Sequence, residues 1–158
     1  MSSHQCYLKG QLSLRDGVTA DQVNGAFKAF LEGQGLSFAD LTASDQISVD
    51  ASNILNIDIP FWSQGYFNDE VEEAAIALGT ICEGDDWIEQ HDIDTGDSEA
   101  SLIPYFIGAT PELRLAARRK YGLLQAQTWL EPILGKDAFA KVQDFAAGFP
   151  LQETKEGR

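Results

Sequence analysis

Hydrophobic and polar positions alternate along residues 6–14. The small and apolar residues fall at the even positions, namely Cys6, Leu8, Gly10, Leu12 and Leu14. A period of two is typical of a strand with one buried face. The dipeptide Asp16-Gly17 predicts the end of this strand.

A helical period follows over residues 20–32. Its apolar positions are Val23, Phe27, Phe30 and Leu31. Thr19 and Gln22 have the spacing of a capping box, which predicts the start of a helix. Two glycines after the apolar positions predict its end. We expect residues 36–45 to form an irregular connection.

A second alternating segment, residues 47–61, predicts a β-hairpin. Its apolar positions are Ile47, Val49, Ala51, Leu55, Ile57, Ile59 and Phe61. Ser52 and Asn53 lie between the two halves, and Asn tolerates the positive φ of a tight turn. Pro60 has no N–H to donate, so we expect the second strand to be an edge there or to end there.

Asn68 predicts the N-cap of a second helix. The first turn after it is rich in acids, which suits the positive end of a helix dipole. Two strands are predicted near residues 86–94 and 101–107, joined by a turn at 95–99. Pro104 again predicts an edge position.

Thr110 and Pro111 predict the start of a C-terminal helix over residues 111–134, with Thr as N-cap and Pro at the first helical position. We expect Pro132 and the following glycine to break it. A shorter helix is predicted at residues 137–147.

The predicted order is β-α-β-β-α-β-β-α-α. Its first six elements have the split βαβ order of a ferredoxin-like β-α-β-β-α-β sandwich. We therefore expect an α+β fold of this type, with an extra hairpin strand and a two-helix C-terminal extension. The length of 158 residues fits one domain, which we expect over residues 1–150. The polar residues 151–158 are expected to form a flexible tail.

The chain is strongly acidic. Eleven Lys and Arg against 25 Asp and Glu give a formal net charge of −14. Direct binding of nucleic acid needs a basic face, so the net charge excludes a nucleic-acid-binding protein. It also disfavours binding to an anionic membrane. We see neither a signal peptide nor an apolar run of membrane-spanning length, so the expected location is cytoplasmic.

The negative charge is unevenly distributed. Residues 69–99 hold 12 acids and no Lys or Arg, whereas residues 111–158 hold 8 basic and 6 acidic residues. Acids at this density repel one another in the folded chain. Two explanations for the density are a solvated acidic surface and a surface that docks on a basic partner. The candidate partner-binding residues are Asp69, Glu72, Glu73, Asp85, Asp86, Glu89, Asp92 and Asp94.

A basic cluster follows in the C-terminal helix, at Arg114, Arg118, Arg119 and Lys120. Four bases are too few for reading a nucleic-acid sequence. We expect them to pair with acids of the same molecule or of a second copy; the alternative is a small anion site.

Other motifs carry little specific chemistry. Residues 92–99 resemble a calcium loop only in part, because position 12 would be Ile103 instead of Glu. His91 shares a strand face with Glu89, but the chain has no nucleophile elbow, so an ordinary surface histidine is the simpler interpretation. Cys6 and Cys82 have no metal-ligand spacing and are expected to be half-buried thiols. We expect no cofactor and no metal site.

The leading hypothesis is a non-enzymatic interaction protein that binds and blocks a basic partner through its acidic residues. Mimicry of nucleic-acid charge is one form of it, as in inhibitors of nucleases or of restriction and CRISPR-type defence systems; an immunity protein is another. The alternative is a small hydrolase-like or ligand-binding domain with a site near His91. A third hypothesis is a homodimer through the C-terminal helices.

Overall fold

The computed structural model describes residues 4–63, 67–92 and 101–152. Over these residues the chain has a mixed α+β fold with one five-stranded antiparallel sheet. The strands are β1 (His4–Ser13), β2 (Ile47–Val49), β3 (Ile54–Ser63), β4 (Trp87–Asp92) and β5 (Ser101–Phe106). The helices are α1 (Ala20–Ala26), α2 (Lys28–Gln34), α3 (Phe38–Ala43), α4 (Asp69–Leu78), α5 (Pro111–Leu134) and α6 (Lys136–Ala147).

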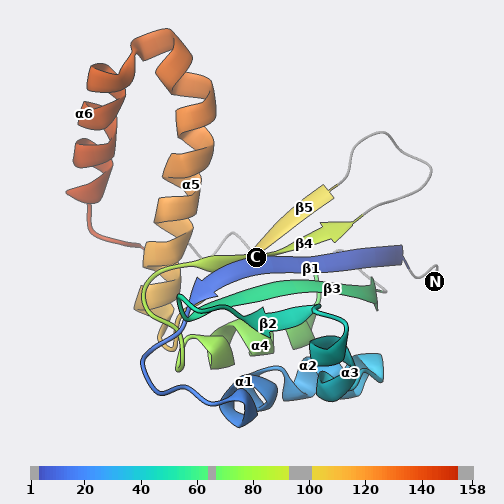
Figure 1. Ribbon diagram of the computed structural model, residues 1–158. Helices are drawn as coiled ribbons and strands as arrows, with labels where there is room; N and C mark the ends of the chain where they lie inside the picture. The colour runs from blue at the N-terminus through green and yellow to red at the C-terminus, as the bar shows by residue number, and fades with distance from the viewer. Residues whose placement is uncertain (1–3, 64–66, 93–100, 153–158) are drawn as a thin grey trace.

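The sheet has the strand order β2-β3-β1-β4-β5, so the first strand of the chain lies at its centre. Helices α1 to α4 lie against one face, which we call the covered face (Figure 1). Alternate strand residues, including Leu8, Ile59 and Ile88, are buried on that side together with Phe27 and Phe30 of the helices. The alternation of the sequence thus decides which side chains enter the core.

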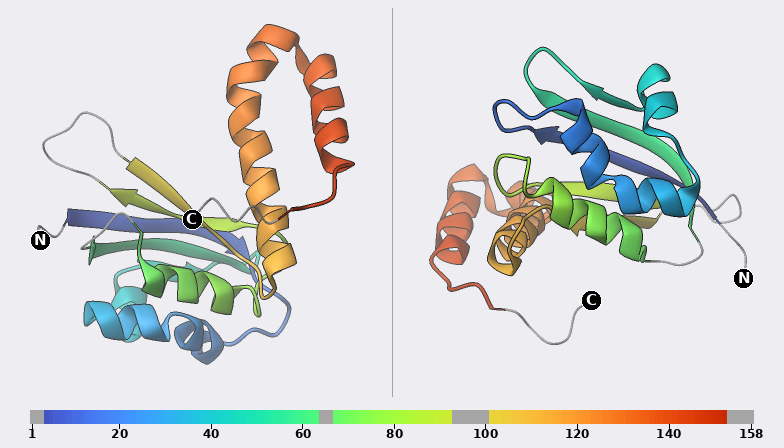
Figure 2. Two further views of the ribbon diagram at one scale, coloured as in Figure 1. Left: turned by 180° about the vertical axis from the view of Figure 1, so that it is seen from behind. Right: turned by 90° about the horizontal axis from the view of Figure 1, so that it is seen from below.

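The opposite face of the sheet, the open face, has no helix laid along it in the described parts of the chain (Figures 1 and 2). Helices α5 and α6 form an antiparallel pair, the helical hairpin, which rises past this face at one end of the sheet (Figure 1). Both the extra strand β5 and the two-helix extension are therefore present as predicted elements.

The capping predictions are confirmed. The Thr19 hydroxyl accepts a hydrogen bond from the Gln22 N–H, and the Gln22 side chain accepts one from the Thr19 N–H. The Asn68 side chain accepts from the N–H groups of Glu70 and Val71. Each of these bonds satisfies an N–H that has no partner inside its helix.

Both proline predictions are confirmed as well. β2 pairs with β3 only over Leu55–Ile57, so β3 has no strand neighbour on that side at Pro60. Pro104 lies in β5, the outermost strand of the sheet. A missing N–H costs no ladder hydrogen bond at such positions.

The prediction of a single helix over residues 20–32 was wrong. The chain forms two helices that meet at Phe27, whose φ of −90° and ψ of 0° depart from the helical values. Phe27 is fully buried, so the packing of its ring into the core accompanies the change of helix direction. The apolar spacing alone predicts one continuous helix, because it records which residues are buried but not this bend.

Residues 36–45 are also more regular than predicted, because α3 (Phe38–Ala43) lies within them. Leu41 of this short helix is buried in the core. The N-cap Ser37 makes no side-chain cap, so the usual local signal is missing, and the packing of Leu41 supplies the stabilisation instead.

The predicted break at Pro132 was wrong, whereas the end at Gly135 is confirmed. Helix α5 continues through Pro132 to Leu134. Proline removes one intrahelical hydrogen bond, and its position two residues before the end of the helix leaves less than one turn beyond it to disturb.

Candidate functional site

The structure divides the predicted acidic residues between several places. Asp69, Glu72 and Glu73 lie on α4, in the helical layer on the covered face. Asp85 and Asp86 precede β4, and Glu89 and Asp92 lie within it. Asp94 and the turn predicted at 95–99 fall outside the described residues, as do residues 153–158 of the predicted tail.

Residues Glu89 and Asp92 of β4 point to opposite sides of the sheet. Glu89 alternates with the buried residues Ile88 and Gln90, so its side chain lies on the open face. Asp92 is three positions further on, pairs with Cys6 in the sheet, and lies on the covered side. The seven of these residues that the structure describes therefore do not form one continuous acidic row.

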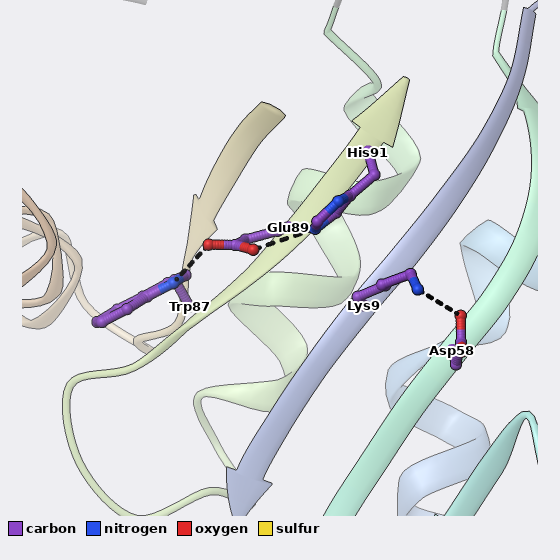
Figure 3. Close-up of polar contacts among 5 residues, drawn as sticks. All are labelled: Lys9, Asp58, Trp87, Glu89 and His91. Carbon is purple, nitrogen blue, oxygen red and sulfur yellow. Dashed lines mark hydrogen bonds and ion pairs between the residues drawn. The ribbon is translucent and has the colours of Figure 1, made fainter. Parts of the chain in front are cut away.

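A polar cluster lies on the open face of β4 (Figure 3). The Trp87 indole N–H donates a hydrogen bond to Oε1 of Glu89 at 3.2 Å. His91 Nε2 lies 3.1 Å from Oε2 of the same carboxylate. The period of two in a strand places these three side chains on one side, and Glu89 connects its two neighbours.

A second pair lies on the adjoining strands. Lys9 Nζ of β1 is 3.6 Å from Oδ1 of Asp58 on β3 (Figure 3). The same ammonium group lies 5.5 Å from the centroid of the Tyr7 ring, within the range of a cation–π contact. Lys9 also pairs with Glu89 in the sheet register, which puts the two polar groups on neighbouring strands.

These side chains border a hollow of about 590 Å³ that is open to solvent. Its lining residues are Lys9, Gly10, Gln11, Asp45, Asn56, Ile57, Asp58, Asp86, Trp87, Glu89 and His91. Four of them are carboxylates, against one lysine and one histidine. Lys9 already faces Asp58, so the lining carries a surplus of negative charge.

The base of α5 packs against the sheet at Trp87, one of the lining residues of this hollow. The Tyr121 ring packs edge-on against Trp87 and Phe106, with centroid distances of 5.1 Å and 5.8 Å. The Lys120 ammonium donates to the backbone carbonyl of Asp85 at 3.0 Å and lies 4.0 Å from the Asp85 carboxylate. Aromatic packing and one ion pair thus fix the hairpin to the sheet.

The predicted basic cluster is used within the molecule. Arg114 donates to the carbonyl of Gly108, and Arg119 donates to the carbonyl of Phe149. Lys120 pairs with Asp85, which confirms pairing with an acid of the same molecule at that position.

The ionisation of Asp86 differs from that of an exposed carboxyl. Burial raises the pKa of this group above its usual value, while the Trp87 N–H and Lys120 act in the opposite direction. A partly desolvated carboxylate of this kind gains more than an exposed one from a cationic group that approaches it.

Asp45 and Asp58 belong to the hollow but were missing from the sequence-based candidates. They come from segments well before the acid-rich stretch at 69–99, and only the strand order brings them close to Glu89. The sequence does mark Asp58 as a polar position, because it alternates with buried residues of a predicted strand.

Other chemistry finds no support in the described residues. No group of three or more His, Cys, Asp or Glu side chains among them is placed to hold a metal ion. Cys6 and Cys82 form no disulfide, and both thiols are more deeply buried than the expected half-buried state. Nor is any of the described helices long and apolar enough to cross a membrane.

No family model matches this chain, and no significant match was found among curated proteins or solved structures.

Proposed function

We propose that the chain is a non-enzymatic, cytoplasmic interaction protein that binds a basic partner through its open face and blocks it. The observation that carries this proposal is the gathering of Asp45, Asp58, Asp86 and Glu89 around one hollow. A cluster of carboxylates attracts a basic partner at long range and selects against an acidic one.

The aromatic residues of the open face support the same class of partner. Tyr7 and Trp87 lie on this side of the sheet, and each ring already has a lysine ammonium nearby, at 5.5 Å and 5.8 Å from its centroid. An Arg or Lys side chain of a partner gains from both a carboxylate and a ring face at such a site.

The partner class we propose is a protein whose own function depends on a basic surface: a nuclease, a restriction or CRISPR-type effector, or a toxin. Carboxylates on the open face then stand in for phosphates. Because the acidic candidates are divided between the two sides of the sheet, we restrict this role to the open-face group and drop α4 from it.

We also propose a ferredoxin-like arrangement for the sheet and its first four helices. The order β2-β3-β1-β4, with helices between β1 and β2 and between β3 and β4, supports it. The fifth strand and the helical hairpin are additions at the end of the chain.

The test compares two variants that lose equal charge. One carries Asp45→Asn, Asp58→Asn, Asp86→Asn and Glu89→Gln on the open face. Its matched control carries four changes on α4, namely Asp69→Asn, Glu70→Gln, Glu72→Gln and Glu73→Gln. An Arg-rich peptide serves as the defined probe, and capture from a native-host lysate follows.

We expect the open-face variant to lose at least ~10-fold in affinity for the peptide and the α4 variant to keep most of it. Binding should weaken between ~50 and ~300 mM salt, because exposed charges are screened. Equal losses of peptide affinity in the two variants would refute a specific role for the open face. An affinity that does not change with salt concentration would refute it as well.

A second candidate is a small-ligand site at the same hollow, hydrolase-like or purely binding. The contact between His91 Nε2 and Glu89 Oε2 favours it, since a carboxylate that orients a histidine is a common arrangement in such sites. Thermal-shift screening of polar metabolites against the wild type and His91→Ala tests it. A shift that vanishes in His91→Ala supports the site, and shifts that are the same in both proteins argue against it.

A further inference from the structure

Large apolar side chains are exposed along the helical hairpin. Ten of the fourteen exposed large apolar residues in the described part of the chain lie within residues 111–151. The most exposed are Trp129 at 76%, Ile133 at 79%, Phe145 at 70% and Phe149 at 57%. Scattered single apolar residues are normal on a surface, but a group of this size marks an interaction site.

The group has a definite arrangement. Trp129 and Ile133 are one turn apart on α5, and Val142, Phe145 and Phe149 follow at helical spacing on and just after α6. The rings of Phe145 and Phe149 pack together with centroids 4.9 Å apart. Helices α5 and α6 pack side by side as an antiparallel pair (Figure 1), and both rows are exposed to solvent. We call these five residues the hairpin patch.

The rest of the chain that the structure describes leaves this patch uncovered. The hairpin meets the sheet at the base of α5, through Tyr121 and Lys120, and its far end extends away from the sheet (Figure 2). The main core cluster contains no residue from either helix of the hairpin. Only Ala117 and Phe139 are buried within the two helices, so their packing uses few of their apolar side chains.

The exposed area is large enough for a protein interface. Taking ~200 Å² for a whole aromatic side chain, Trp129, Phe145 and Phe149 together expose ~400 Å². A stable interface of ordinary size buries about 800 Å² on each partner. These three rings therefore supply about half of that area before Ile133, Val142 and the flanking polar residues are added.

The charge distribution favours a second copy of this chain as the partner. Residues 1–110 carry 3 basic and 19 acidic residues, so contact between two such regions brings like charges together. Residues 111–149 carry 6 basic and 4 acidic residues, so the hairpin is nearly balanced. It is thus the part of the chain where two copies can meet with little repulsion.

We infer that two copies associate through their hairpin patches and form a four-helix bundle. An antiparallel helix pair that joins its own copy about a two-fold axis completes such a bundle and hides the same residues on both sides. This inference does not depend on the proposed function, and the two fail separately.

Sedimentation equilibrium between ~1 and ~200 µM tests it on the full chain. We expect a dimer for the wild type and at least ~30-fold weaker association for Trp129→Ser and for Phe145→Glu, one change on each helix, because buried aromatic residues dominate interface energies. The control Trp62→Ser removes an aromatic residue of 59% exposure on β3, outside the hairpin, and should stay dimeric. Circular dichroism checks that each variant is folded.

Salt dependence separates this interface from the proposed binding face. Screening reduces repulsion between two acidic copies, so dimerisation should strengthen from 50 to 300 mM salt, while binding of a basic partner weakens. A wild type that stays monomeric at ~200 µM overturns the inference, even if it binds another protein. A dimer that persists in both hairpin variants also overturns it.

Discussion

The indole ring of Trp87 meets the ring of Tyr121 edge-on, with the centroids 5.1 Å apart and the planes at 77°. This contact joins the fourth strand of the sheet to the helical hairpin. Tyr121 also packs against Phe106 on the neighbouring strand, so one side chain connects α5 to two strands. The position of the hairpin relative to the open face depends on this ring.

We predict that Tyr121→Ala loosens the hairpin without unfolding the sheet. Each aromatic pair contributes about 0.5–1.5 kcal/mol beyond the area it buries, and the variant loses two pairs. Hydrogen exchange should become faster in α5 and α6 and stay slow in β1 and β3. Leu124→Ala, an exposed residue one turn along α5, is the control and should leave exchange unchanged. Uniformly faster exchange in the sheet would contradict this view of the contact.

Gly79 follows α4 and lies against the segment that leads into α5. A Cβ atom there would be 2.4 Å from the backbone N of Ala109 and from the carbonyl carbon of Gly108. Backbone atoms cannot move aside as a side-chain end can, so we expect Gly79→Ala to lower the free energy of unfolding by about 1–3 kcal/mol.

Gly122→Ala is the matched control for that substitution. Gly122 lies inside α5 with no neighbour within 4 Å of an added Cβ. Alanine is the better helix former, so this variant should gain about 1 kcal/mol. Urea unfolding measures both changes. A Gly79→Ala variant that loses no stability relative to the wild type would show that the close approach at Gly79 is relieved by movement.

Tyr105 holds a buried polar chain together on the covered side of the sheet. Its hydroxyl donates to Gln90 Oε1 at 2.9 Å and accepts from the Asn68 N–H at 2.9 Å. We predict that Tyr105→Phe costs about 1–3 kcal/mol of stability, because a buried amide oxygen loses its donor. Tyr7→Phe, on the open face, should cost little. If Tyr105→Phe and Tyr7→Phe have similar melting temperatures, water has replaced the lost Tyr105 hydroxyl.

The buried thiols make stability depend on alkaline pH. Burial raises the pKa of Cys6 to about 11, and the nearby carboxylate of Asp92 adds to this effect. Burial likewise raises the pKa of Cys82 to about 12, with a further contribution from Asp86. A free thiol ionises near 9, so between that pH and the raised values the folded chain holds protons that the unfolded chain has released. The free energy of unfolding must then fall as pH rises through this window.

Urea unfolding from pH 7 to 10.5, under reducing conditions, checks this dependence. We expect Cys82→Ala to lose stability less steeply with pH than the wild type, although it starts lower because of the lost packing. A decline that runs parallel in the two proteins would assign the effect to other groups, such as Tyr105, whose pKa burial raises to about 12.

The sequence predicts those features that depend on neighbouring residues. The caps at Thr19, Asn68 and Thr110 are local hydrogen bonds, and the proline positions follow from one missing donor. The bend at Phe27 and the helix around Leu41 depend on core packing instead, which the spacing of apolar residues does not determine.

The candidate site was predicted only in part for a related reason. Asp86 and Glu89 were identified from the density of acids at 69–99, but the same density includes Asp92, which the strand turns to the other side. Asp45 and Asp58 join the site through strand order, which long-range pairing sets. Charge density along the chain therefore identifies an acidic protein more reliably than an acidic surface.

The central place of β1 has a consequence for the order in which the chain can fold during synthesis. This strand leaves the ribosome well before its two neighbours: Cys6 pairs with Phe61 on one side and with Asp92 on the other. Until β3 emerges this apolar strand has two unpaired edges, and until β4 emerges it still has one. Contacts between residues so far apart in sequence form slowly, and exposed strand edges invite association between nascent chains. The high acidity of the intervening residues keeps such chains apart by mutual repulsion during that interval.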